Sequence, residues 1–259
     1  MKTAAAAIFF ASAVVSGALA ETGELKAFAA CPVYRDTDDG IKSGCWLATD
    51  PETGIVYDVS RAPTKPDWNF GVLVEGYVEE GAADTCGGVV LNPMRLSLLR
   101  DRACVRRVLP AEDYPGVKFR LPGRTVQPLY IPRKPPEPPH EDVTFNLFFD
   151  YNRDFLVYQL DDYLMDDAAN HIVSSSPKKV TVTGYAVREP YEVAGGVFVE
   201  KEEIAKARAE TVAEALRRMG VPAELISIRT AFNPEPVTTE GTGDIPEASR
   251  RRADIFVDY

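Results

Sequence analysis

Few side chains in this 259-residue sequence have types and spacings suited to catalysis or metal binding. The only histidines are His140, in a proline-rich stretch, and His171. No His-Glu-x-x-His, Gly-x-Ser-x-Gly, phosphate-loop or Cys-x-x-Cys motif occurs. Helical spacing would place the carboxylates of Asp162 and Asp166 on one face, but without a third ligand type a solvated face is the better interpretation. We therefore expect no enzyme activity, no cofactor and no metal site.

The beginning of the sequence has the composition of a secretory signal. Lys2 precedes an apolar run from Ala4 to Val15, and Ala18-Leu19-Ala20 is a small-x-small cleavage pattern. We expect residues 1–20 to be removed on export, and no later segment approaches the roughly 20 apolar residues of a membrane-spanning helix. Export changes the formal charge from 29 − 39 = −10 to 28 − 39 = −11. This acidity argues against nucleic acid or an anionic membrane as the partner.

Four cysteines occur, all in the first half of the chain, and an exported protein meets an oxidising compartment. Cys31, Cys45, Cys86 and Cys104 are therefore expected to form disulfides rather than to bind metal. Three pairings are possible. We prefer Cys31 with Cys45 and Cys86 with Cys104, because these pairs close the shortest loops.

A run of prolines divides the chain. Six prolines fall between Gln127 and His140, which predicts a semi-rigid spacer over residues 127–141, with an SH3-type ligand as the alternative. The residues before it, 21–126, have short alternating runs such as Phe70 to Val78 and Val117 to Leu121, separated by Gly, Pro and Asp. We expect a small, mostly-β domain there, a sandwich or barrel held by disulfides.

The residues after the spacer, 142–259, alternate between strand and helix patterns and predict an α+β fold, a two-layer sandwich of order βαβαββ. The expected strands and helices are, in order, strand Val143 to Phe149, helix Asp154 to Ser174, strand Lys179 to Tyr185, helix Glu200 to Met219, strand Leu225 to Thr230 and strand Ala253 to Tyr259. The second helix has a clear apolar stripe, and Gly220 and Pro222 are suited to end it.

Five short motifs of this half occur in the order found in one protein family. They are Phe148-Phe149-Asp150-Tyr151-Asn152, Val180 to Tyr185, the helical run Ile204 to Ala209, Gly220-Val221-Pro222, and Ser249 to Arg252. Residues 143–259 thus resemble the OmpA-like C-terminal domain, whereas the first half resembles no family that we identify. The resemblance implies non-covalent binding of the stem peptide of peptidoglycan, a ligand end with carboxylates and an ammonium.

The resemblance also implies which residues would bind that ligand. Arg208 is at the position of the family's guanidinium, which pairs with a ligand carboxylate, and Ile204 opens the same motif. Tyr151 and Asn152 follow the first strand, where the family has an acid. The alternative for Arg208 is a surface arginine paired with Glu200, Glu203 or Glu210. Arg250, Arg251 and Arg252 match the family's arginine pair. They either support the pocket, contact anionic glycan or form an exposed charge run at the start of a strand.

The chain departs from the family where an acid should bind the ligand's ammonium. Val187 occupies that position, and the segment from Val187 to Arg208 is about six residues longer than usual. Glu189 or Glu192 in the longer loop could replace the carboxylate; otherwise they are solvated loop residues. Loss of one partner of a desolvated charge pair costs about 2–5 kcal/mol, so the ligand site is expected to be degenerate.

Two functions follow from these observations. The first is an exported tether, periplasmic or associated with the outer membrane, that binds peptidoglycan while its first half contacts another envelope protein. The second is an envelope interaction or assembly module that keeps the OmpA-like fold without wall binding. A wall-cleaving enzyme is a third class, because the separation of carboxylates in space is not visible in a sequence.

Overall fold

The computed structural model describes residues 23–36, 44–81, 86–110 and 134–259. The expected signal segment, the strand expected at 117–121 and the proline-rich residues up to 133 lie outside this part of the chain. The first half contains β1 Leu25–Ala30, β2 Val33–Arg35, β3 Cys45–Thr49, β4 Val56–Asp58, β5 Phe70–Val78, β6 Val89–Ala103 and β7 Val108–Leu109. The second half contains β8 Val143–Phe148, α1 Tyr158–Ser175, β9 Lys179–Ala186, β10 Tyr191–Val193, β11 Gly196–Phe198, α2 Glu203–Arg218, the 3₁₀ helix η1 Ala223–Leu225, β12 Ile226–Phe232, α3 Pro246–Arg250 and β13 Arg252–Asp258.

The strands of the first half form one sheet in the order β1-β5-β6-β4-β3-β2-β7. The long strand β6 pairs with β5 along most of its length and with β4 at its first residues, which joins the two parts of the sheet. Alternate side chains of these strands point to one face and form an apolar core, in which Phe28, Tyr57 and Leu91 have no exposed surface. The prediction of a mostly-β first half is confirmed for the described residues.

The preferred cysteine pairing is wrong. The disulfides are Cys31–Cys104 and Cys45–Cys86, with Cα–Cα distances of 5.7 and 5.9 Å. Strand pairing decides this, because β1 and β6 both flank β5 and therefore bring the ends of β1 and β6 together. Short loops in the chain were a poor guide, since the sheet pairs strands that are distant in sequence.

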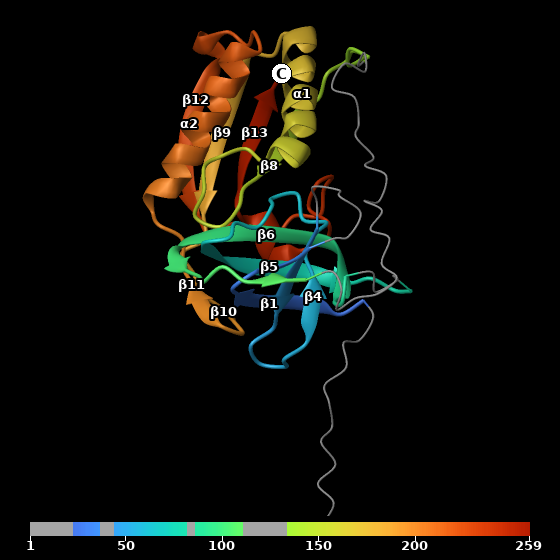
Figure 1. The fold of residues 1–259 in the computed structure, drawn as a ribbon. Helices are drawn as coiled ribbons and strands as arrows, with labels where there is room; N and C mark the ends of the chain where they lie inside the picture. Colours follow the sequence, from blue (N-terminus) through green and yellow to red (C-terminus); the bar gives the residue numbers. More distant parts are fainter. Residues whose placement is uncertain (1–22, 37–43, 82–85, 111–133) are drawn as a thin grey trace, which may run out of the picture.

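The second half is a two-layer α+β unit. Its sheet has the order β12-β9-β13-β8, with β12 parallel to β9 and the other neighbours antiparallel. Both α1 and α2 pack on one face of this sheet (Figure 1). The predicted order βαβαββ is confirmed, with three additions: the short helices η1 and α3 and the hairpin formed by β10 and β11.

The apolar stripe of α2 faces the sheet as the sequence predicted. Ala209, Val212 and Leu216 are fully buried in the core between the helices and the sheet. Gly220, which has a φ of +97°, ends the last turn of this helix. The first helix begins at Tyr158 rather than Asp154, because Leu156, two residues before it, forms a β-bridge with Phe149.

The two halves are in direct contact. The β10–β11 hairpin lies beside the seven-stranded sheet, away from the core of its own half (Figure 1). Phe28 of β1 forms a parallel β-bridge with Ala194 in the hairpin turn. The segment expected as a longer irregular loop is therefore a strand pair that joins the halves. The division into separate domains stays a prediction.

Candidate functional site

Arg208, the predicted ligand-binding arginine, is completely buried. It lies on the buried side of α2, with a side-chain exposure of 0%. Its Nε donates to the carbonyl of Arg153 at 2.9 Å, and Nη1 and Nη2 donate to the carbonyls of Tyr185 and Asp150 at 2.7 and 3.1 Å. The same two nitrogens donate to Glu200 at 2.8 and 2.5 Å. Because a guanidinium has five N–H groups, every donor of Arg208 has a partner within the chain.

The carboxylate of Glu200 is equally enclosed, with a side-chain exposure of 1%. Besides the two bonds from Arg208, its oxygens accept the backbone N–H groups of Asn152 at 2.7 Å and Val187 at 2.9 Å. Burial alone would raise the pKa of the Glu200 carboxyl, but the Arg208 guanidinium more than offsets this and holds the pKa below its usual range. Glu200 is therefore a charged, fully satisfied partner of Arg208. Together these four residues form what we call the Glu200 site.

Two other predicted residues belong to the Glu200 site through their backbones. Val187 is buried, and its backbone N–H donates a hydrogen bond to Glu200. The family resemblance implied an acidic side chain at this position. Asn152 adopts a left-handed conformation, with φ +52°, which turns its N–H toward Glu200. Its side-chain oxygen accepts the N–H of Lys201 at 3.0 Å, just after Glu200. Asn152 thus contributes hydrogen bonds and no charge to the Glu200 site.

The remaining predicted residues lie around this site without contacting its carboxylate. Tyr151 donates its hydroxyl to the carbonyl of Val199 at 2.9 Å and packs edge-on against Phe198. Ile204 packs in a small apolar cluster at the start of α2. Glu189 forms an ion pair with Arg250 at 2.5 Å and is 59% exposed, so it does not replace the family acid beside Arg208.

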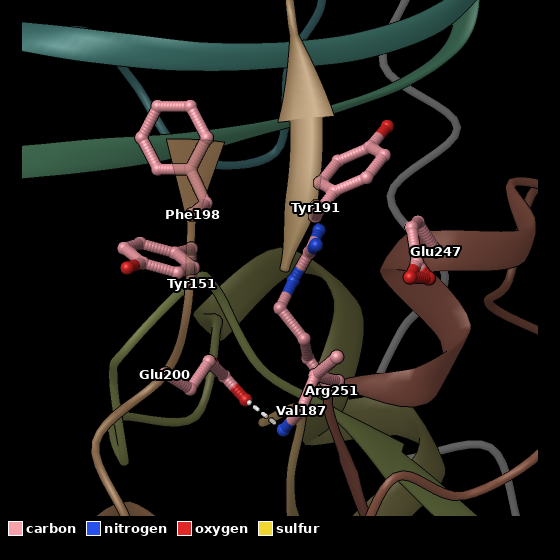
Figure 2. A pocket seen from close by; sticks show the side chains of 7 residues that line it. All are labelled: Tyr151, Val187, Tyr191, Phe198, Glu200, Glu247 and Arg251. Carbon is pink, nitrogen blue, oxygen red and sulfur yellow. Dashed lines mark hydrogen bonds between the residues drawn. The ribbon is translucent and has the colours of Figure 1, made fainter. Parts of the chain in front are cut away.

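A small pocket opens beside the Glu200 site (Figure 2). Its volume of about 230 Å³ includes open space at its mouth, so the enclosed part is smaller than this figure. Figure 2 shows the aromatic rings of Tyr151 and Phe198 on one side and Tyr191 with Arg251 on the other. The carboxylate of Glu200 closes its lower end. Arg208 is not among the residues that line this pocket.

A second group of buried charges lies where the two halves meet. Arg251 donates to both carboxylate oxygens of Glu75 on β5, one of them at 3.2 Å, and neither side chain is more than 4% exposed. Arg95 on β6 is buried near Asp150 and Asp161. Burial raises the pKa of Asp150 and raises that of Asp161 to about 7, although the positive Arg95 acts against both shifts. These charges are shielded from water by both halves at once.

The prediction missed three of the residues that shape this region. Glu200 was predicted only as one possible partner of a surface arginine. The structure does pair Glu200 with Arg208, but both side chains are buried. Glu75 and Arg95 lie in apolar strands of a half that resembled no known family. A signal for them existed, because a charge within an apolar strand such as β5 needs a buried partner. Arg251 is one such partner, and because it is buried, the prediction of an exposed charge run is wrong for this residue.

The described residues contain neither a membrane-spanning helix nor a cluster of metal ligands. None of the helices in residues 23–36, 44–81, 86–110 and 134–259 combines the length and the apolar composition needed to cross a bilayer. Over the same ranges, no three or more His, Cys, Asp or Glu side chains are grouped so that they could hold a metal ion.

Comparison with known proteins gives matches only among solved structures. No protein-family model and no curated protein matches the sequence. The OmpA-like domain of FopA1 from Francisella tularensis is 20% identical, with a TM-score of 0.34, over 45% of this chain and 71% of that one. The peptidoglycan-associated lipoprotein from Burkholderia pseudomallei is also 20% identical, with a TM-score of 0.33, over 44% of this chain and 89% of that one.

A third similar solved structure is a periplasmic domain. The periplasmic domain of Helicobacter pylori MotB is 21% identical, with a TM-score of 0.34, over 45% of this chain and 81% of that one. The solved structures to which this chain is similar are OmpA-like domains, and they cover about 45% of it.

Proposed function

We propose that this chain is a non-enzymatic cell-envelope protein whose OmpA-like half acts as an interaction or assembly module and does not hold a peptidoglycan stem peptide through Arg208. Of the two functions that the sequence left open, the geometry favours the second. One observation carries the proposal: the Arg208 guanidinium has no exposed surface, and all five of its N–H groups are bonded within the chain.

Competition explains why a stem peptide would not bind at Arg208. A ligand carboxylate reaches the guanidinium only after the Glu200 carboxylate leaves, and Glu200 then loses four hydrogen bonds. Separating a desolvated charge pair costs about 2–5 kcal/mol. A carboxylate on the same chain also competes at an effective concentration on the order of millimolar or more. A weakly bound external ligand is therefore excluded.

The rest of the chain suits a protein outside the cytoplasm. Two disulfides brace the first half, which fits an oxidising compartment such as the periplasm. We place the protein in the periplasm or at the outer membrane after removal of residues 1–20. The seven-stranded sheet is the part that contacts another envelope component.

Cosedimentation with purified sacculi tests this proposal. The wild type and Arg208→Ala are compared with Arg217→Ala, a matched control because Arg217 lies on the same helix and is 37% exposed. Circular dichroism verifies that each variant is folded. We expect all three proteins to stay in the supernatant, without release of soluble muropeptides.

Sedimentation of the wild type would overturn the proposal. If Arg208→Ala but not Arg217→Ala abolished that sedimentation, the stem-peptide site would be restored as the function. Sedimentation that survived both substitutions would show wall binding at another surface. Release of muropeptides would identify an enzyme.

A further inference from the structure

We infer that the β10–β11 hairpin couples the seven-stranded sheet to Arg208: while the hairpin is docked it holds Glu200 in place, and when it undocks it frees a site for one carboxylate group. This inference rests on the closed Glu200 site of the proposed function. It adds a structural reason for the closure and a way to reverse it.

The hairpin is held on the first half by polar contacts at its turn. The N–H of Ala29 on β1 donates to the carbonyl of Ala194 at 2.7 Å. The next carbonyl of the turn, that of Gly195, accepts Nη1 of Arg102 on β6 at 3.1 Å. The turn is thus bonded to two strands of the seven-stranded sheet.

Apolar packing extends the same contact along the hairpin. Three of its side chains and Tyr151 pack on a buried cluster of the seven-stranded sheet. The cluster consists of Ala29, Leu73 and Leu99, and the side chains that pack on it are Tyr151, Tyr191, Val193 and Phe198. Tyr151, which precedes Asn152 of the Glu200 site, and the hairpin residues, which precede Glu200 itself, are therefore both packed against the first half.

Gly195 makes this close docking possible. Its φ is +90°, and a Cβ at this position would lie 2.3 Å from the carbonyl oxygen of Ala29. No L-amino acid with a side chain fits there without moving the hairpin away from β1. Gly195 is therefore a position at which docking can be disturbed without touching Arg208 or Glu200.

The hairpin is connected to Glu200 through a very short segment. Only Val199 separates the end of β11 from Glu200. The carbonyl of Val199 accepts the Tyr151 hydroxyl, and the N–H of Glu200 donates to the carbonyl of Val187 at 2.9 Å. With so little free chain, displacement of β11 must also displace the Glu200 side chain.

The donors left behind fit a single carboxylate. Nη1 and Nη2 of Arg208 and the N–H groups of Asn152 and Val187 all converge on the two oxygens of Glu200. A planar guanidinium with two backbone donors matches the acceptor positions of one carboxylate. The freed site is therefore expected to bind a small carboxylate such as formate.

Native-state hydrogen exchange, measured by NMR, tests the coupling. The amides of Asn152 and Val187 donate to the Glu200 carboxylate, so their protection reports whether Glu200 is in place. Gly195→Ala should lower this protection about 5- to 100-fold relative to the amides of β9, because the strain displaces the hairpin. Gly220→Ala is the matched control, since φ is also positive there but an added Cβ meets nothing within 4 Å.

A milder variant guards against loss of the fold. Arg102→Ala removes one hydrogen bond to the hairpin turn and should lower protection of the same two amides about 2- to 10-fold. Unchanged protection in Arg102→Ala, or an equal loss in Gly220→Ala, would overturn the coupling. If Gly195→Ala does not fold, Arg102→Ala decides alone.

Formate tests the carboxylate site itself. Glu200→Ala leaves a buried unpaired guanidinium and should lower Tm by about 6–20 °C. With a Kd near 10 mM, about 100 mM formate should restore roughly 3–6 °C relative to chloride at equal ionic strength. Glu189→Ala, which removes an exposed partner of Arg250, should show no formate effect.

Equal Tm values in formate and chloride would refute the carboxylate site. If Glu200→Ala does not fold in chloride, the yield of folded protein in each salt replaces Tm, and failure in both also refutes it. Neither result depends on sacculus binding, so failure of this inference is distinguishable from failure of the proposed function.

Discussion

The ion pair between Glu75 and Arg251 gives the sharpest prediction about how the two halves depend on each other. Glu75 is on β5 of the first half and Arg251 immediately precedes β13 of the second. Their side chains are 0% and 4% exposed. Water therefore does not solvate either charge, and each side chain neutralises the charge of the other. Glu75→Ala leaves Arg251 buried without this partner, which costs about 3–5 kcal/mol of unfolding free energy.

An exposed ion pair provides the control. Arg61 and Glu79 are 2.5 Å apart, but their side chains are 36% and 27% exposed. Arg61→Ala should therefore cost no more than about 1 kcal/mol. The difference between the two variants compares a buried arginine–carboxylate pair with two hydrogen bonds and a more exposed pair with one.

Equilibrium unfolding in urea supplies the measurement. Both tryptophans are in the first half, and the long helices α1 and α2 are in the second, so fluorescence and circular dichroism at 222 nm follow different halves. We expect coincident transitions in the wild type, because the shared buried charges make the halves unfold together. A loss below 1 kcal/mol in Glu75→Ala, or separate transitions in the wild type, would refute this reasoning.

Two further predictions concern titration and disulfides. Burial raises the pKa of Asp161 from 3.8 to about 7 in the folded protein. Between these two pH values the folded state keeps the Asp161 proton and the unfolded state loses it. The free energy of unfolding should therefore fall by up to about 1.4 kcal/mol per pH unit as the pH rises from 3.8 to 7. Asp161→Asn should flatten the slope in urea titrations between pH 5 and 7, and an unchanged slope would contradict the assignment. Tryptic digestion separates all four cysteines, so non-reducing peptide mapping should recover Cys31 linked to Cys104 and Cys45 linked to Cys86. Linked peptides with the neighbouring pairs instead would exclude this sheet topology.

Local patterns predicted the second half well because they follow from local physics. The stripe of α2 and its end at Gly220 depend on helical spacing and a glycine conformation, and both are as expected. The cysteine pairing failed because it depends on which strands are neighbours in the sheet. No spacing along the chain encodes that β1 and β6 flank β5.

The candidate site was predicted only in part for a similar reason. The motif placed Arg208 on the correct helix, and the partner Glu200 was among three acids considered for it. Whether Arg208 and Glu200 form an exposed surface pair or a closed site depends on their burial. That burial depends in turn on the contacts of the β10–β11 hairpin with the first half. Those contacts join segments more than 90 residues apart and cannot be recognised from either segment alone.

The closed state of Arg208 is the central claim, and ¹⁵N NMR of its side chain tests it most directly. A guanidinium held by five hydrogen bonds should give separate Nη resonances that exchange slowly with water. We expect this pattern for Arg208 in the wild type and its loss in Glu200→Ala. A single averaged, rapidly exchanging Nη resonance in the wild type would contradict the account.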